Sequence, residues 1–67
     1  MERNICLNWP ELVKEAIMRR KEQHLSQEQL AILAGVSKPT LNHFEQGKMN
    51  ITLAKALKIL TILGLTA

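Results

Sequence analysis

The sequence predicts an all-α fold, a compact bundle of four to five helices. Apolar residues recur at intervals of three and four positions along most of the chain, as they do on the buried face of a helix. No alternating strand pattern of useful length occurs outside residues 4–8. The chain contains one Trp and one Phe, so Leu, Ile and Ala must fill the core, which favours a small helical bundle over a sheet.

The length of the chain limits it to one domain. Its 67 residues are expected to form a single unit, 1–67, with a core from about residue 10 to residue 65. Residues 1–8 carry no firm signal, so a flexible segment and a short strand that pairs with a partner both remain open. A domain this small buries only about 60% of the surface of its unfolded chain, so a second chain would add stability.

A first helix is expected to begin after Asn8. Asn is a favourable N-cap residue, Pro10 is tolerated in the first turn, and Glu11 stands where a capping box places a Glu. The helix should end between residues 22 and 24. Its inward face is expected to hold Val13, Ala16, Ile17 and Arg20, with Leu12 at the edge.

The segment that follows predicts two short helices joined by a tight turn. Ser26 and Ser37 are N-cap residues, and Gly35 stands where the first of the two helices must stop. The helices then span residues 27–34 and 38–46, too close in sequence to avoid crossing at a steep angle. Their inward residues are expected to be Leu30, Ala31, Leu33 and Ala34 in the first, and Leu41 and Phe44 in the second. This arrangement is a helix-turn-helix.

A last helix is expected to begin after Asn50 or Thr52 and to end near Leu63. On a helical wheel its inward stripe is formed by Leu53, Ala56, Leu57, Leu60 and Leu63. Ile59 and Ile62 fall outside this stripe. Because two isoleucines in contact with water are unusual on a small protein, we expect them to form a dimer interface.

The same residues resemble those of lambda-repressor-like (Xre, Cro/C1-type) DNA-binding domains. The matching positions are Gln27, Leu30-Ala31, Gly35-Val36-Ser37, Leu41, Phe44-Glu45 and Gly47-Lys48. The resemblance extends more loosely from about residue 12 to residue 65. The last third of the chain is also similar to DNA-binding antitoxins of the HipB type. The resemblance implies a lambda-repressor-like bundle that binds double-stranded DNA.

The outward side of the second motif helix is the candidate for reading bases, since a helix fits the major groove of B-DNA. Lys38 can donate to guanine, Asn42 or Thr40 can bond a base edge or a phosphate, and Pro39 offers only an apolar contact. His43 can also donate. The family pattern adds Ser37 to this set of base contacts.

The resemblance also implies phosphate contacts. Gln27 matches a family position whose amide holds the DNA backbone, and Gln46, the Gly47 amide and Lys48 match the clamp on the other side. In many relatives the positions of Arg20 and Glu45 form a partly buried salt bridge. We expect that pair here in a structural role, although an Arg20 that contacts DNA stays open.

The charge distribution is consistent with a nucleic-acid partner. The net charge is +3, and from residue 35 onward four lysines face a single acid, Glu45, whereas the first half balances five basic and five acidic residues. An apolar run of about 18 residues and a signal peptide are both missing, so the expectation is a cytoplasmic protein without a membrane partner.

The sequence offers little for catalysis. Cys6, His24 and His43 lie far apart along the chain, and no metal-binding, phosphate-binding or nucleophile motif occurs. We expect no enzymatic activity, no metal and no cofactor.

Two functions remain open at this point. The first is a dimeric, sequence-specific regulator, expected to be a repressor, that binds a near-palindromic operator. The second is an antitoxin whose main task is to bind a toxin protein, with DNA contact used for autoregulation.

Overall fold

The computed structural model describes residues 8–66, which form four helices and no strand. The helices are α1 (Trp9–Glu22), α2 (Gln27–Ala34), α3 (Lys38–Glu45) and α4 (Leu53–Ile62). The prediction of an all-α bundle is confirmed. The expectations for residues 1–7, a flexible segment or a pairing strand, lie outside the described residues.

All four helices begin at the side chain that the sequence predicts as a cap. The side chains of Asn8, Ser26, Ser37 and Thr52 each accept a hydrogen bond from the backbone N–H three residues further on. The caps of α1 and α2 are complete capping boxes, closed by Glu11 and Gln29. Thr52, and not Asn50, is the cap of α4.

The helices also end in one common way. Each is followed by a residue in the left-handed conformation, and the next backbone N–H bonds back to the last turn, as in a Schellman motif. Gly35 takes this place between α2 and α3, with φ of 72°, which permits the sharp turn of the motif. After α1 the place is taken by His24, with φ of 59°. A residue with a Cβ is strained there.

Replacing His24 with glycine is therefore expected to stabilise the domain. Removing the left-handed strain outweighs the added flexibility of the unfolded chain by about 0.5–1 kcal/mol, or a rise of roughly 2–8 °C in Tm. His43 has helical geometry inside α3, so His43→Gly should instead cost about 0.3–0.5 kcal/mol. Thermal unfolding of both variants checks the pair, and a lower Tm for His24→Gly would contradict the strain argument.

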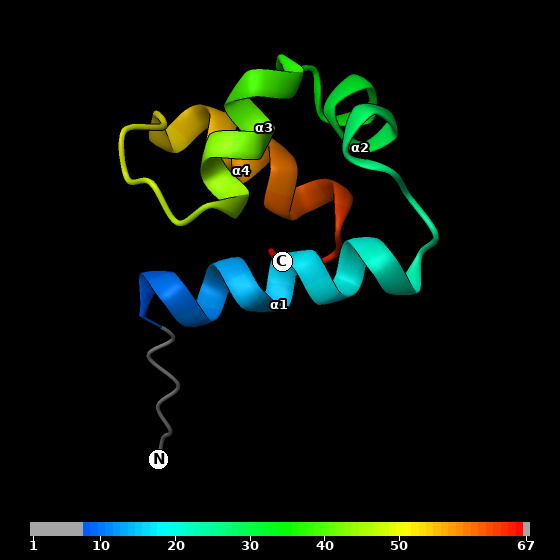
Figure 1. Cartoon of the computed structure of the whole chain (residues 1–67), viewed down its shortest axis with the longest axis horizontal. Coiled ribbons are helices and arrows are strands. Elements are labelled where there is room, and N and C mark those ends of the chain that lie inside the picture. Colours follow the sequence, from blue (N-terminus) through cyan, green and yellow to red (C-terminus); the bar gives the residue numbers. More distant parts are fainter. Residues whose placement is uncertain (1–7, 67) are drawn as a thin grey trace.

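The core is formed by residues from all four helices. Figure 1 shows α1 running along one side, with α2, α3 and α4 above it. α2 packs mainly against α4 and α3, while α3 also contacts α1. The small side chain of Ala31 is buried in α2 and leaves room for this close packing. The largest fully buried side chains are Phe44, Leu30, Leu41, Ile59 and Leu63.

The structure corrects the predicted orientation of α4. Ile59, expected on the surface, is 0% exposed, whereas Leu53 and Leu57, expected inside, are 75% and 44% exposed. The buried stripe is Ala56, Ile59, Leu60 and Leu63. The wheel placed Ala56, Leu60 and Leu63 inside correctly, but apolar residues flank this stripe on both edges, so the wheel left the exact rotation of the helix open. Since Ile59 is covered by its own chain, it cannot form the dimer interface.

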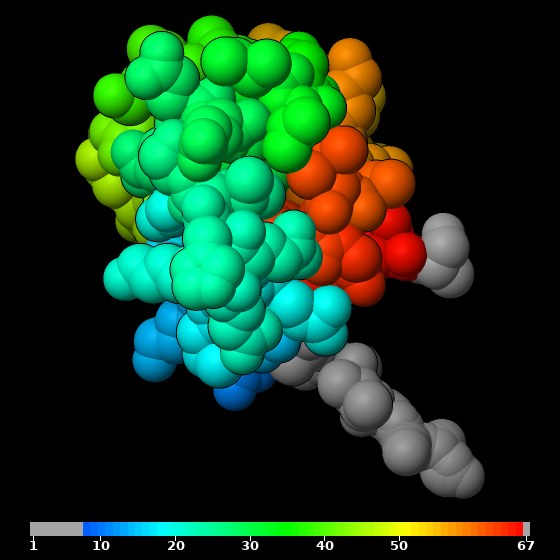
Figure 2. Space-filling model, turned by 90° about the vertical axis from the view of Figure 1, so that its right-hand side faces the viewer, coloured from blue at the N-terminus to red at the C-terminus, as the bar shows by residue number. Residues whose placement is uncertain are grey.

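A second correction concerns α2. Leu33 was expected inside, but it is exposed together with Ile32, while Leu30, Ala31 and Ala34 are buried. Figure 2 shows the face of the molecule on which α2 and the C-terminal half of α4 lie side by side. Leu33 of α2 and Ile62 of α4 line a groove between these two helices.

Candidate nucleic-acid interface

The packing of α3 sets which of its side chains can meet a ligand. Leu41 and Phe44 are fully buried and anchor the helix to the core. Lys38, Pro39 and His43 are exposed. Pro39 lies in the first turn, where its missing N–H costs no helical hydrogen bond. The helix is thus held rigidly along one side and leaves a polar side in contact with solvent.

Residues from two helices meet at a shallow recess on this polar side. It has a volume of about 400 Å³ and is lined by Gln27, Lys38, Pro39, Asn42 and His43. The structure therefore brings four of the six predicted base-contact residues together with the N-terminus of α2. This placement is what insertion of α3 into a groove requires, because the residues predicted to contact bases and the helix end predicted to face a phosphate share one face.

Ser37 and Thr40, the other two predicted base-contact residues, do not line this recess. The Ser37 hydroxyl donates to Thr40 Oγ1 at 2.7 Å and accepts from the Thr40 backbone N–H at 3.2 Å. Its hydrogen-bonding capacity is largely used by the cap. Thr40 faces a second, smaller recess beside the N-terminus of α4.

The second recess contains residues that sequence reasoning did not single out. Thr40 and His43 line it together with Asn50, Ile51, Thr52 and Lys55. The positive charge of Lys55 was noted in the sequence only as part of the general balance. Its place in the same recess as His43 depends on how α4 packs on α2, which no local pattern indicates.

The other end of α3 holds the remaining predicted phosphate contacts. Gln46 and Lys48 are exposed there. The Gly47 amide is a correction, because its N–H donates to the Phe44 carbonyl at 3.0 Å and is not free for a phosphate. The Gly47 carbonyl accepts a bond of 3.1 Å from Trp9 Nε1, which ties the start of α1 to the end of α3.

The predicted ion pair between α1 and α3 is present. Arg20 Nε donates to Glu45 Oε2 at 2.7 Å and Arg20 Nη2 donates to Glu45 Oε1 at 3.2 Å, so the pair is bidentate. The two side chains are only 13% and 7% exposed. Arg20 Nη1 also donates to the Leu25 carbonyl at 2.8 Å. With three donors engaged inside the protein, Arg20 has a structural role.

The side-chain amide of Gln27 was predicted to hold a phosphate, but its donors are used within the protein. Its side-chain nitrogen donates to Glu45 Oε1 at 2.8 Å and to Asn42 Oδ1 at 3.4 Å. Both hydrogens of the NH₂ group are therefore engaged within the protein. What remains at this position for a phosphate is the backbone N–H in the first turn of α2.

The electrostatics of the interface follow from the ion pair. Glu45 is the single acid from residue 35 onward, and Arg20 neutralises it. The first turn of α3 contains no acid, so its N-terminal N–H groups add to the positive field of Lys38. This face should attract a polyanion.

Other kinds of site find no support among residues 8–66. No group of three His, Cys, Asp or Glu side chains is placed to hold a metal ion in that part of the chain. In the same residues, no helix combines the length and the apolar composition needed to cross a membrane.

Comparison with known proteins agrees with this geometry. A family model described as helix-turn-helix matches residues 17–67, which include α2, α3 and α4. The chain belongs to the lambda-repressor-like helix-turn-helix family. The match includes both motif helices and the turn at Gly35.

A relative of this helix-turn-helix domain is found in Haemophilus influenzae. It is named an uncharacterized HTH-type transcriptional regulator and is 42% identical over 55 residues. These residues are 82% of the domain described here but 56% of the relative, so the chain spans little more than half of the relative's length.

Proposed function

We propose that this helix-turn-helix domain is a sequence-specific regulator of transcription that binds double-stranded DNA. The observation that carries the proposal is the shared recess of α2 and α3, in which Gln27 lies beside Lys38, Asn42 and His43. The regulator-like name of the Haemophilus influenzae relative supports the same function.

In this proposal α3 enters the major groove with its N-terminal half against the bases. Lys38 donates to guanine O6 or N7, and Asn42 and His43 contact the neighbouring base edges. Pro39 adds an apolar contact, while Ser37 and Thr40 lie at the rim, where their mutual hydrogen bond limits them to secondary contacts.

Phosphates are held on both sides of α3. The first-turn backbone N–H of Gln27 faces one strand, and Lys48 with Gln46 faces the other. Lys55, beside His43 in the second recess, adds a further positive contact near α4. These groups set the register of the helix on the duplex without reading its sequence.

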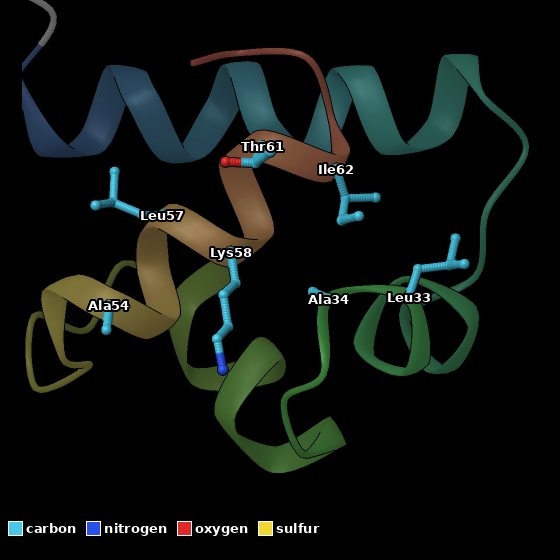
Figure 3. Close-up of a pocket in the computed structure, with 7 residues that line it drawn as sticks. All are labelled: Leu33, Ala34, Ala54, Leu57, Lys58, Thr61 and Ile62. Carbon is cyan, nitrogen blue, oxygen red and sulfur yellow. The ribbon is translucent and has the colours of Figure 1, made fainter. Parts of the chain in front are cut away.

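We further propose that the domain binds as a homodimer through the groove between α2 and α4. This groove has a volume of about 410 Å³ and is mostly apolar. Figure 3 shows the residues that line it, which are Leu33, Ala34, Ala54, Leu57, Lys58, Thr61 and Ile62. Leu33, Leu57 and Ile62 are exposed. Apolar side chains gathered on one surface of so small a domain favour burial against a partner. Ile62 therefore stays in the proposed interface, and Leu33 and Leu57 take the place of Ile59.

A dimer would present two α3 helices to a near-palindromic operator with half-sites about 10 base pairs apart. At an operator that overlaps a promoter, the bound dimer would block polymerase, so repression is the expected effect. The alternative, an antitoxin that binds a toxin protein and autoregulates its operon, is supported by the same groove, because an apolar helix of a toxin could occupy it.

Selection of DNA from a random library tests the main proposal. Purified protein should enrich a two-fold related motif, and a gel shift should then show tighter binding to this operator than to random DNA at the same salt concentration. Equal binding to both would contradict the proposed function. Co-purification with the product of an adjacent gene would favour the antitoxin.

Two lysines should separate base contacts from phosphate contacts. Lys38→Ala is expected to relax the preference at particular base pairs, at a cost of about 1–3 kcal/mol on the operator. Lys48→Ala should weaken binding to every sequence alike and reduce the salt slope by about one. Titrations of operator and random DNA at several salt concentrations check both, and equal effects of the two variants would contradict the assignment.

A charged substitution in the groove tests the proposed dimer interface. Ile62→Asp should give a monomer at micromolar concentration, because a carboxylate in the apolar groove loses its hydration on association. Leu53→Asp is the matched control, since Leu53 is exposed on the same helix but outside the groove and should leave the dimer intact. Sedimentation measures the mass of each variant. An unchanged dimer in Ile62→Asp would place the interface elsewhere.

A further inference from the structure

A chain of hydrogen bonds runs from α1 to the base-reading side of α3. It begins at Arg20, passes through Glu45 and Gln27, and ends at Asn42. The bond between Gln27 Nε2 and Glu45 Oε1, at 2.8 Å, is the shorter of the two that Gln27 makes. The bond from the same nitrogen to Asn42 Oδ1, at 3.4 Å, closes the chain.

The chemistry of Arg20 sets the direction of every bond in this chain. A guanidinium only donates, and an ionised carboxylate only accepts. Gln27 must therefore turn its nitrogen, and not its oxygen, toward Glu45. The second hydrogen of that nitrogen points at Asn42, which must turn its oxygen toward Gln27.

The burial of the ion pair makes this direction persistent. Since the side chains of Arg20 and Glu45 are almost fully buried, neither can replace its partner with water at low cost. A flip of the Gln27 amide would place its oxygen against the carboxylate. A flip of the Asn42 amide would place two NH₂ groups face to face.

We propose that Gln27 is a positioning residue that fixes the amide of Asn42, so that Asn42 meets DNA as a hydrogen-bond donor. Asn42 then selects base edges that accept in the major groove, such as N7 and O6 of guanine or N7 of adenine, and disfavours the N4 amino group of cytosine. This inference rests on the proposed function. It assigns the side chain of Gln27 to specificity and not to the phosphate backbone.

A double-mutant cycle tests the proposal. Gln27→Ala, Asn42→Ala and the double variant are titrated with the selected operator, with operators altered at each base pair, and with random DNA at one salt concentration. Asn42→Ala identifies the base pair that Asn42 reads. Gln27→Ala is expected to relax the preference at that same base pair by about tenfold. It should leave random DNA within twofold and add less than twofold in the Asn42→Ala background.

A phosphate clamp gives the opposite pattern. In that case Gln27→Ala weakens operator and random DNA equally and adds fully to Asn42→Ala, which would overturn the proposal. Gln27→Met, which keeps the length of the side chain but not its hydrogen bonds, should behave as Gln27→Ala. If it keeps the wild-type preference, packing and not the amide positions Asn42, and the proposal is wrong.

The free protein provides a readout that does not depend on DNA. In NMR spectra, Gln27→Ala should shift and broaden the side-chain NH₂ signals of Asn42, since its amide would no longer be held. Unchanged signals would overturn the positioning role. A wild-type protein that shows no DNA preference would overturn the proposed function instead, whatever the NMR spectra show, so the two failures are distinguishable.

Discussion

Replacing Glu45 with alanine is expected to lower the free energy of unfolding by about 3 kcal/mol. The substitution leaves the guanidinium of Arg20 nearly buried without its counter-ion, and it removes the acceptor of the shorter Gln27 bond. A domain of this size has a total stability of only about 3–10 kcal/mol. The variant should therefore be partly unfolded near 37 °C, as measured by urea denaturation at a fixed protein concentration.

The chain contains a matched control for this prediction. Glu15 pairs with Arg19 at 3.3 Å within α1, but the side chains are 40% and 37% exposed for Arg19 and Glu15 respectively. Glu15→Ala should cost no more than about 0.5 kcal/mol, because solvent screens an exposed pair. In the double variant Arg20→Met, Glu45→Leu, much of the lost stability should return, since no unpaired charge stays buried. Equal costs for Glu15→Ala and Glu45→Ala would show that burial of the pair does not matter.

Replacing Phe44 with alanine is expected to cost about 3–5 kcal/mol. Phe44 is fully buried and its ring meets that of Trp9 edge to face, with centroids 5.5 Å apart and planes at 89°. The cavity that the missing ring leaves lies where α3 is anchored, so the variant should also lose the proposed DNA binding. Trp9 is the only Trp in the chain, so its fluorescence during urea denaturation reports the loss of this contact.

Two further variants serve as controls for the stability loss expected in Phe44→Ala. Phe44→Leu keeps most of the volume and should cost about 1–1.5 kcal/mol. Leu53→Ala removes a large apolar side chain from an exposed position of α4 and should stay within about 0.5 kcal/mol of the wild type. If Phe44→Ala and Leu53→Ala have similar costs, the assignment of α3 to the core is wrong.

The candidate site was only partly predictable from sequence. The outward position of Lys38, Asn42 and His43 follows from the spacing of Leu41 and Phe44 in one helix. The recess that joins them to Gln27 depends on the crossing of α2 and α3, which the tight turn at Gly35 already implied. The proximity of Lys55 depends on how α4 packs, and no sequence pattern indicated it.

The family resemblance predicted roles for some residues without their hydrogen-bond partners. It implied that Gln27 and the Gly47 amide face phosphates, but the structure engages both donors inside the protein. It also implied the Arg20–Glu45 pair, which is present. The predictions for Gln27 and Gly47 failed for a physical reason. Whether a donor is free depends on every acceptor within hydrogen-bonding distance, and the sequence shows only the neighbours along the chain.

The sequence by itself determined the existence of each helix and located its ends closely, although it left the cap of α4 open between Asn50 and Thr52. Caps such as Ser26 and Ser37 and the left-handed turn at Gly35 act over three to five residues, so their effect can be recognised locally. Only the tertiary structure decided the exact rotation of α4, which places Ile59 inside and Leu57 outside. Since apolar residues flank the buried stripe of α4 on both edges, its rotation is set by the shape of the surface that α2 presents to it, and that shape exists only after folding.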